Sequence, residues 1–392
     1  MADAWIVSTA RTAIGTARRG TLADADPFDL AATVVGEAVR RSGLDPALVD
    51  DVVMSESRHG GGDIARHAAV EAGLVHAPGL AHNRHCAGGL AAVTTAAATV
   101  RAGMDRVVVA GGVESASTAP RLQRRTPGTD DWVDWAPPSH PDTPDAPCED
   151  MSITVGWNAA VQAGVSREEM DAWALRSHQR AVAAIDAGAF VDEIVPIEVA
   201  RRDGTIVTFS VDEHPRRDSS LGKLASLEVI HPEIEGFSIT PGNSSGRNDG
   251  AAALVVADAE VASAAGLAPL AVVRAWASVG VPPRETGLAP VRAIPKALGR
   301  AGLEVGDVDL WEINEAFAAM CIGTVRQLAI DDERVNVVGS GCSLGHPVAM
   351  TGARMVMSLT HELRRRGGGV AVAAMCAGGG MGTAVVLDVP AP

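Results

Sequence analysis

The tetrapeptide Arg41-Ser42-Gly43-Leu44 returns later in the chain as Arg300-Ala301-Gly302-Leu303, 259 positions further on. The same offset aligns seven identical residues between positions 38 and 56 and their counterparts, where unrelated segments would share about one or two. Each copy has the pattern of a helix that ends near a glycine, followed by a turn and a strand. The chain therefore contains two related halves.

The likeness between the halves extends in both directions. Each half opens on an apolar strand, at 4–7 and at 271–274. Later in each half come a glycine-containing turn, an Ala-rich helix to about 102 or 365, and an apolar strand, at 106–110 or 370–374. Repeated strand–helix–strand units with continuous apolar strands predict an α/β fold in which helices cover mainly parallel sheets.

The segment at roughly 115–270 has no counterpart in the other half. Its Pro- and Asp-rich stretch 136–142 predicts a loop without regular structure. Ser166 and Glu169 form a capping box, which predicts a helix that reaches Ile185 and ends at Gly188. The insert also carries a basic group, which is typical either of a solvated face or of a phosphate-binding site: Arg201, Arg202, Arg216, Arg217 and Lys223.

Charge and composition exclude several classes of protein. The 392 residues include 33 Lys and Arg against 48 Asp and Glu, a net charge of −15, which argues against nucleic acid as the main partner. No apolar run reaches the roughly 18 residues of a membrane span. The first residues lack the pattern of a secretory signal, so we expect a cytoplasmic protein that does not associate with membranes.

The chain has five cysteines and no C-x-x-C pair: Cys86, Cys148, Cys321, Cys342 and Cys376. An odd number without such pairs argues against a disulfide scaffold or a structural zinc site and indicates a reducing compartment. His82 and His85 next to Cys86 suggest a metal, but no second ligand pair is near in sequence. We therefore expect no metal site.

Cys86 is the first candidate nucleophile, because it stands at the start of a predicted helix. Unpaired backbone N–H groups and the helix dipole would stabilise its thiolate and lower its pKa, and the following glycines would let a ligand approach closely. A small buried core residue is the alternative. The repeat aligns His346 with Cys86 to within one residue, and Pro347 suits the first helical position. A Cys–His pair is the minimum for a thiolate nucleophile.

Two further segments contain residues that could take part in catalysis or binding. Cys376 precedes the glycine-rich run 378–382, which predicts backbone N–H groups aimed at a ligand, or else a plain turn. Asn314 and Glu315 place an amide and a carboxylate at a strand end.

A competing motif, Gly242-Asn243-Ser244-Ser245-Gly246, matches the G-x-S-x-G of serine hydrolases. That alternative would use Ser244 with a downstream histidine, but Pro241 disfavours its strand-to-turn geometry and it leaves the cysteine segments unexplained.

Together these segments resemble the thiolase family, the acyl-CoA:acetyl-CoA acyltransferases, in order and over nearly the whole chain. The segments that are similar to family motifs are Arg11-Thr12-Ala13-Ile14-Gly15, Asn83-Arg84-His85-Cys86, Gly111-Gly112-Val113-Glu114-Ser115, Ser166-Arg167-Glu168-Glu169, Asp212-Glu213-His214-Pro215-Arg216, Gly242-Asn243-Ser244-Ser245-Gly246, Asn314-Glu315-Ala316-Phe317, Gly345-His346-Pro347 and Cys376-Ala377-Gly378-Gly379-Gly380-Met381-Gly382.

The resemblance implies an α/β thiolase fold. Its two duplicated βαβαβ-type halves would hold mixed, mainly parallel sheets in a layered α/β/α/β/α arrangement, with an insert domain. We expect the N-terminal half at 1–115 with a returning segment near 250–268, the insert at 116–249, and the C-terminal half at 269–392. The resemblance also implies an oligomer, a homodimer or a homotetramer.

The resemblance implies a role for each candidate in the reaction. Cys86 would carry the acyl group, His346 would take its proton, and Cys376 would move the α-carbon proton of the second acyl-CoA. Asn314 would orient a water that forms one oxyanion hole with His346, and the N–H groups of Cys86 and Gly378 would form the other. Such reactions build charge on two different oxygens, so they need two sets of donors.

The implied substrates are CoA and acyl-CoA, with no tightly bound cofactor. Arg216 would contact the nucleotide end, Ser245 the pantetheine arm, and Ala316 and Phe317 the channel, with Lys223 a further candidate. We expect reversible cleavage or condensation of 3-ketoacyl-CoA by a ping-pong mechanism, as in β-oxidation and other fatty acid metabolism. A non-catalytic acyl-CoA-binding protein of the same fold is the second alternative.

The chain departs from the family pattern at four places. Ala87-Gly88 follows the nucleophile, Asp150-Met151 stands where some members have His-Met, segment 227–231 lacks Lys-Pro-x-Phe, and Val348-Ala349-Met350 replaces Leu-Gly-x. None removes a catalytic group. They bear on acyl-chain specificity and CoA affinity.

Overall fold

Strands that are buried on both faces form the centre of the molecule. The computed structural model describes residues 3–59 and 63–392. The main sheet contains β1 (Ala4–Arg11), β2 (Gly15–Thr16), β3 (Asp51–Ser55), β4 (Gly79–His82), β5 (Val107–Ser115), β10 (Asn248–Asp258), β11 (Ala271–Gly280), β12 (Leu310–Ile313), β13 (Gly369–Ala377) and β14 (Met381–Val389). Two separate hairpins are β6 (Gln123–Arg125) with β7 (Trp132–Asp134), and β8 (Ile197–Ala200) with β9 (Ile206–Phe209).

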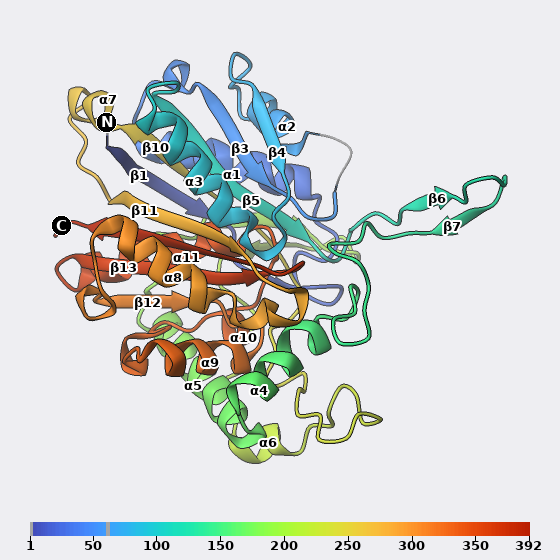
Figure 1. The fold of residues 1–392 in the computed structure, drawn as a ribbon. Helices are drawn as coiled ribbons and strands as arrows, with labels where there is room; N and C mark the ends of the chain where they lie inside the picture. The colour runs from blue at the N-terminus through green and yellow to red at the C-terminus, as the bar shows by residue number, and fades with distance from the viewer. Residues whose placement is uncertain (1–2, 60–62) are drawn as a thin grey trace.

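The helices surround this sheet and build the insert (Figure 1). They are α1 (Pro27–Ser42), α2 (Ile64–Glu71), α3 (Gly88–Arg101), α4 (Asn158–Ala163), α5 (Arg167–Asp186), α6 (Leu221–Ala225), α7 (Ala259–Ala264), α8 (Pro290–Ala301), α9 (Ala318–Leu328), α10 (Gly341–Leu344) and α11 (Thr351–Arg365). The strands and helices predicted at equivalent places of the two halves are all present.

The strand order confirms the duplication. Outward from the centre, the first half runs β1-β10-β5-β3 and the second half runs β11-β14-β13-β12. The two halves join where β1 pairs antiparallel with β11, through Trp5 with Val272 and Ile6 with Ala271. One continuous sheet therefore passes through both halves.

The expectation of mainly parallel pairing is wrong. The main sheet is mixed, but six of its strand pairs are antiparallel and three are parallel. The parallel pairs lie at the outer ends, β4-β3-β5 and β12-β13. A continuous apolar run indicates that both faces of a strand are buried, but it does not indicate the direction of the neighbouring strand. Antiparallel strands that lie between two helix layers are also buried on both faces.

Helices α3 and α11 form the layer between the two halves. α3 packs on β5 and β3 of its own half and on β14 of the other, while α11 packs on β13 and β12 and also on β10. With α1 on the outside of the first half and α8 on the outside of the second, this gives the expected α/β/α/β/α layers.

Two glycines allow α3 and α11 to touch through their backbones. A Cβ atom on Gly352 would lie 2.2 Å from the backbone nitrogen of Leu90, and one on Gly89 would lie 2.6 Å from that of Ala353. Gly88 is equally constrained, since a Cβ there would meet Ser55 Oγ at 1.8 Å. The glycines expected to admit a ligand therefore serve helix packing at this place. Their close approach brings the N-terminal ends of α3 and α11 together.

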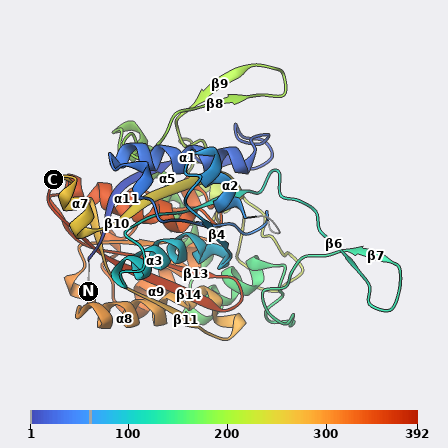
Figure 2. The same cartoon turned by 90° about the horizontal axis from the view of Figure 1, so that it is seen from above.

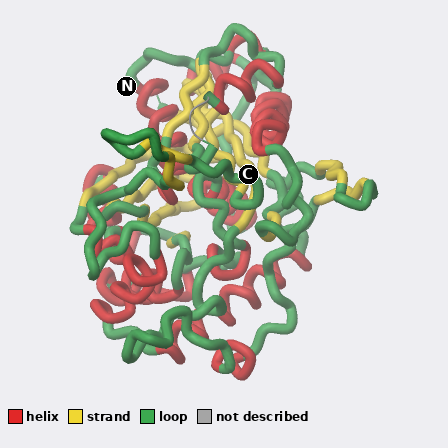
Figure 3. The backbone as a smooth tube through the Cα atoms, turned by 90° about the vertical axis from the view of Figure 1, so that its right-hand side faces the viewer, coloured by secondary structure: helices red, strands yellow, loops and turns green. Residues whose placement is uncertain are grey.

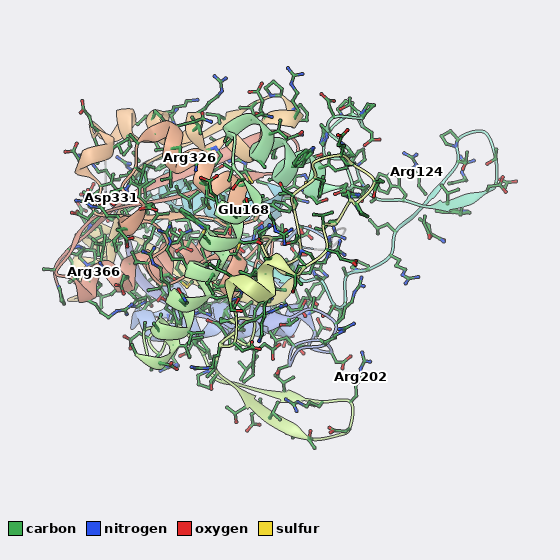
Figure 4. The ribbon with its side chains drawn as sticks, turned by 90° about the horizontal axis from the view of Figure 1, so that it is seen from below. Arg124, Glu168, Arg202, Arg326, Asp331 and Arg366 are labelled. Atoms are coloured by element: carbon green, nitrogen blue, oxygen red, sulfur yellow. The ribbon has the colours of Figure 1, made fainter. Side chains whose placement is uncertain are left out.

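The insert covers one side of the second half and sends out two hairpins. Helix α5 begins at Ser166 with the predicted capping box and packs against α9 and α10, and segment 136–141 forms no helix or strand. Figure 2 shows both hairpins projecting from the body, and Figure 4 labels Arg124 and Arg202 on them. Figure 3 shows the strands of the main sheet gathered in one part of the molecule, with helices and loops making up much of the rest. Among the described residues, no helix is long and apolar enough to cross a membrane.

Candidate active site

Cys86 lies in a 3₁₀ turn, His85–Ala87, that leads directly into α3. This is the predicted position at a helix entrance. The turn packs against β13 and α11, which belong to the other half of the chain. The Cys86 side chain is partly exposed, so a substrate can reach it.

The surroundings of Cys86 raise the pKa of its thiol to about 11. Burial is the main cause, and Glu114 adds to it; backbone N–H groups of Gly378 and of Cys86 itself oppose the shift. The expected lowering of this pKa is therefore wrong for the free enzyme, because burial outweighs the stabilising N–H groups. Cys86 rests as a thiol and needs a base.

His346 is the residue that the sequence predicts as that base. Its Nδ1 lies 2.7 Å from the Thr351 hydroxyl, and its backbone N–H donates to Asn248 Oδ1. Burial lowers the pKa of His346 to about 3, and Arg354 contributes. The imidazole is thus neutral at physiological pH and can accept a proton.

The expected helical position of His346 and Pro347 is wrong. α11 begins at Thr351, and a turn at 348–350 separates it from Pro347. His346 instead forms a β-bridge with Arg247. Gly345 has a φ of 99°, and a Cβ there would lie 2.5 Å from the Asn248 side chain, so the backbone path to His346 requires glycine.

Asn314 lies beside His346. Its Nδ2 is 3.4 Å from His346 Nε2, and its backbone N–H donates to Ala374 on β13. Its Oδ1 is buried and makes no hydrogen bond within the described part of the chain. An unpaired buried amide oxygen marks a place for a water or a substrate group.

Cys376 lies near the C-terminal end of β13, two residues before Gly378. Its Sγ lies 3.5 Å from the Met320 Sδ, and burial raises its pKa, with the neighbouring Cys86 as the second cause. The two thiols therefore belong to one site. Gly379 and Gly380 have φ values of 87° and 80° in the hairpin that follows, which any other residue would strain.

Both halves of the chain match a family model. The model described as "Thiolase, N-terminal domain" covers residues 4–260, and "Thiolase, C-terminal domain" covers residues 267–389. The chain belongs to the thiolase family.

Known relatives are similar to this chain over their full length. The chain is 39% identical to a 3-ketoacyl-CoA thiolase of Bacillus subtilis, covering 99% of this chain and 100% of that protein, and 40% identical to an acetyl-CoA acetyltransferase of Escherichia coli, covering 99% of each. The crystal structure of the Bacillus anthracis acetyl-CoA acetyltransferase matches with a TM-score of 0.89 at 38% identity, over 99% of each chain. The chain is thus a thiolase-type acyltransferase that uses acyl-CoA substrates.

The residues expected to contact CoA fall into two groups in this thiolase. Ser245, Ala316 and Phe317 lie together: the Ser245 N–H donates to the Ala316 carbonyl, and Ser244 forms a β-bridge with Phe317. Arg216 instead lines an open pocket of about 290 Å³ with Arg217 and His178.

Much of the basic group in the insert is paired with carboxylates. Arg202 pairs with Asp24, Arg217 with Asp186, and Lys223 with Asp218. These three are exposed ion pairs of the kind that contribute little to stability. Arg201 and Arg216 make no such pair within the described residues.

The serine hydrolase alternative is wrong. Ser244 Oγ donates its proton to the Thr240 carbonyl at 2.7 Å, and its loop runs into strand β10 instead of a helix. A hydrolase nucleophile needs a strand-to-helix turn and a histidine that accepts its proton. The comparisons likewise favour an enzyme over a non-catalytic binding protein, since the named relatives are acyltransferases.

The groups that hold the site in place could not be identified from the sequence. The Glu315 carboxylate is buried and accepts from Trp173 Nε1, Ser177 Oγ, Asn336 Nδ2 and the Cys342 N–H, so it fixes the backbone beside Asn314. Thr351 and Asn248 hold His346 but carry no sequence signal of their own. For Glu315 a signal existed, a carboxylate at a strand end, but nothing in the sequence identified its donors.

Two of the segments that depart from the family pattern are in contact with each other. His231 Nε2 lies 2.7 Å from Asp150 Oδ2, and its Nδ1 lies 2.8 Å from Glu233. Glu233 and Asp150 raise the pKa of His231, although burial opposes them. The substitution at 150 is therefore matched by a partner from segment 227–231.

Proposed function

We propose that the chain transfers an acyl group between CoA thioesters in two half-reactions, with Cys86 as the carrier. In the cleaving direction, Cys86 Sγ attacks the 3-keto carbon of a 3-ketoacyl-CoA while its proton passes to His346 Nε2. The bond between C2 and C3 breaks, its electron pair moves to C2, and Cys376 donates its proton there. Acetyl-CoA leaves, and the acyl group stays on Cys86 as a thioester.

The second half-reaction uses the same groups. A proton passes from the imidazolium to the Cys376 thiolate and makes both groups neutral again. His346 then takes the thiol proton of CoA, the CoA sulfur attacks the thioester, and Cys86 leaves as a thiolate that regains the proton from His346. The condensing direction reverses these steps. A neutral base beside a neutral thiol suits such transfers, since neither group pays for a buried charge before substrate binds.

Backbone and amide groups would stabilise the oxygens that become negative. We assign the N–H groups of Cys86 and Gly378 to the oxygen of the carbonyl that Cys86 attacks, because both point at Cys86 Sγ. We assign His346 and Asn314 to the enolate oxygen of acetyl-CoA, with a water held by the unpaired amide oxygen. No tightly bound cofactor is part of this proposal, since each proton and each charge has a group of the chain to serve it.

For CoA itself, we propose that Ser245, Ala316 and Phe317 line the pantetheine channel and that Arg216 meets the phosphates, with Lys223 a secondary contact. We retain the division into residues 1–115 with a returning segment near 250–268, 116–249 and 269–392. Strands β1, β3 and β5 fall in the first range, most of β10 falls in the returning segment, and β11 to β14 fall in the last range. We further propose a cytoplasmic homodimer or homotetramer acting in fatty acid metabolism such as β-oxidation. Leu80 on the edge strand β4 and Trp132 on the β6–β7 hairpin are 45% and 62% exposed, which favours burial by other copies.

The observation that supports the proposal is the contact between the two halves at Cys86: its turn packs against β13, which carries Cys376, and against α11, which carries Thr351, the hydrogen-bond partner of His346. Intact-mass measurement after incubation with acetyl-CoA tests it. Wild type should gain one acetyl group and Cys86→Ala none. Cys148→Ala, a change of the other partly exposed cysteine, is the matched control and should still be acetylated. Acetylation of Cys86→Ala would overturn the assignment.

A further inference from the structure

Helix α11 presents two polar side chains within one turn of its start. Thr351 and Arg354 are three positions apart, and side chains at this spacing lie side by side on a helix. The Thr351 hydroxyl lies 2.7 Å from His346 Nδ1, and the Arg354 guanidinium forms an ion pair with the Glu312 carboxylate. One face of α11 therefore contacts both the predicted base and strand β12.

Strand β12 carries the partner groups at a matching spacing. Glu312 and Asn314 are two positions apart, and such residues of an extended strand point to the same face of a sheet. The Asn314 N–H donates to the Ala374 carbonyl, so the pairing of β12 with β13 continues to this residue. Asn314 Nδ2 lies 3.4 Å from His346 Nε2. The face of β12 that meets α11 thus also meets His346.

These contacts form a closed ring. From His346 the ring passes through Thr351 and Arg354 on α11, crosses to Glu312, and returns through Asn314 to His346. Within α11 and within β12 the backbone fixes the spacing of the side chains. The ion pair is the link that holds the helix to the strand, so a change in this pair would change the distance between His346 and Asn314.

The ion pair is buried. The side chains of Arg354 and Glu312 are 0% and 3% exposed, and Ser340 Oγ donates to Glu312 at 2.9 Å. Burial raises the pKa of Glu312, and Arg354 opposes this shift. Both charges lose their hydration here, and apolar residues of similar volume often stabilise a fold as well as such a pair or better. Stability alone therefore does not account for this pair.

We propose that Arg354 and Glu312 are positioning residues for the reaction, and that their ion pair sets the distance between His346 and Asn314. The inference rests on the proposed function, which assigns His346 and Asn314 to the enolate oxygen of acetyl-CoA. Two groups that serve one oxygen act together only when their spacing matches it, so a small displacement of either costs much of the rate. Arg354 and Glu312 are themselves buried and act through Thr351 and Asn314.

A double variant, Arg354→Met with Glu312→Leu, tests the proposal. It removes both charges at similar volume, so the melting temperature should stay close to that of wild type. We expect kcat for cleavage of acetoacetyl-CoA to fall by roughly tenfold or more while KM changes little. Hydrogen–deuterium exchange at the methyl group of acetyl-CoA, which reports enolate formation, should fall by a similar factor. Intact mass should still show one acetyl group on the variant.

A second variant keeps the test valid if the double variant fails to fold. Arg354→Lys leaves Glu312 a buried cation, but a single ammonium lacks the fixed fork of the guanidinium, so kcat should still fall by roughly threefold or more. The matched control is Arg274→Met with Asp388→Leu. It removes an ion pair of the same half, at the end of β14 that lies away from Met381, and should keep the wild-type kcat and exchange rate.

The inference would be overturned by a wild-type exchange rate in the double variant, or by equal losses in that variant and the control. Unchanged kcat in Arg354→Lys would overturn it as well. The wild-type enzyme separates this inference from the proposed function. If wild type neither gains an acetyl group nor exchanges methyl hydrogens, the proposed function is wrong; if it does both and the Arg354 variants match it, only the positioning role is wrong.

Discussion

His346 and Thr351 share a 2.7 Å hydrogen bond that fixes which nitrogen of the imidazole carries the proton. The Thr351 hydroxyl donates its own hydrogen to the Pro347 carbonyl at 2.8 Å. Its oxygen must therefore accept from His346, so the proton resides on Nδ1. Nε2 is left as the acceptor nitrogen, which faces Asn314 Nδ2 at 3.4 Å and can take up a proton.

Replacing Thr351 by valine should remove this control of the tautomer with little change in shape. We expect kcat for cleavage of acetoacetyl-CoA to fall by roughly tenfold or more, because a misplaced proton disables a general base, while KM changes little. Thr351→Ser keeps the hydroxyl and should restore most of kcat. Steady-state kinetics of both variants check this; equal kcat for wild type and Thr351→Val would contradict it.

Cys376→Ala should separate acyl transfer from carbon–carbon chemistry. Cys86 and His346 remain, so the variant should still take an acetyl group from acetyl-CoA, as seen by intact mass. Without the thiol at the α-carbon, condensation of two acetyl-CoA molecules should fall by roughly 10²-fold or more. Loss of hydrogen–deuterium exchange at the acetyl methyl group would localise the defect. A variant that condenses at the wild-type rate would remove Cys376 from the mechanism.

The contact between α3 and α11 should tolerate no side chain at Gly352. Gly352→Ala inserts a Cβ 2.2 Å from the Leu90 nitrogen, so the helices must separate, at a cost of roughly 1–3 kcal/mol or more in stability. Because α3 follows the turn that holds Cys86, and α11 carries Thr351, the hydrogen-bond partner of His346, activity should fall as well. The matched control is Gly299→Ala in α8, where a Cβ meets nothing within 4 Å; it should be neutral or more stable by about 0.5–1 kcal/mol. Urea unfolding compares the two variants, and equal midpoints would contradict the prediction.

Buried histidines should make the protein sensitive to acid. Burial lowers the pKa of His346 to about 3 and those of His82 and His178 to about 4, from 6.5. As pH falls from 6.5 towards 4, the unfolded chain gains protons that the native chain does not bind, so stability decreases in that window. Glu114, whose pKa is raised to about 7, acts in the opposite sense.

Two variants test whether His178 contributes to this loss of stability in acid. His178→Gln retains an acceptor for the Arg216 N–H, so its melting temperature should fall less steeply than that of wild type as pH is lowered through this window. His76→Gln, a change at an exposed histidine, should follow the wild-type slope. Parallel slopes for wild type and His178→Gln would show that His178 does not contribute.

Local and repeated features could be read from the sequence. The capping box of Ser166 and Glu169 forms within one turn, so it depends on few other residues, and α5 begins where it predicts. The repeat around Arg41 and Arg300 identified two halves because both copies fold by the same local rules. It also aligned Cys86 with His346, and their pairing in catalysis stays a prediction.

Features that depend on distant segments could not be read in this way. Strand direction was misjudged because apolar sequence reports burial and says nothing of which strand lies alongside. Gly88 and Gly89 looked suited to a ligand, whereas their neighbours are Ser55 and the backbone of α11. The link between His231 and Asp150 joins residues 81 positions apart in an irregular region, where no periodicity indicates contact.

The duplicated α/β plan, the thiolase resemblance and the candidate residues Cys86, His346, Asn314 and Cys376 follow from residue types in local patterns, so they could be inferred without coordinates. How those residues behave chemically depends on contacts between distant segments. Burial makes Cys86 a weak acid and His346 a weak base, and Thr351 sets the tautomer, because solvation and hydrogen-bond partners arise only when distant segments pack together.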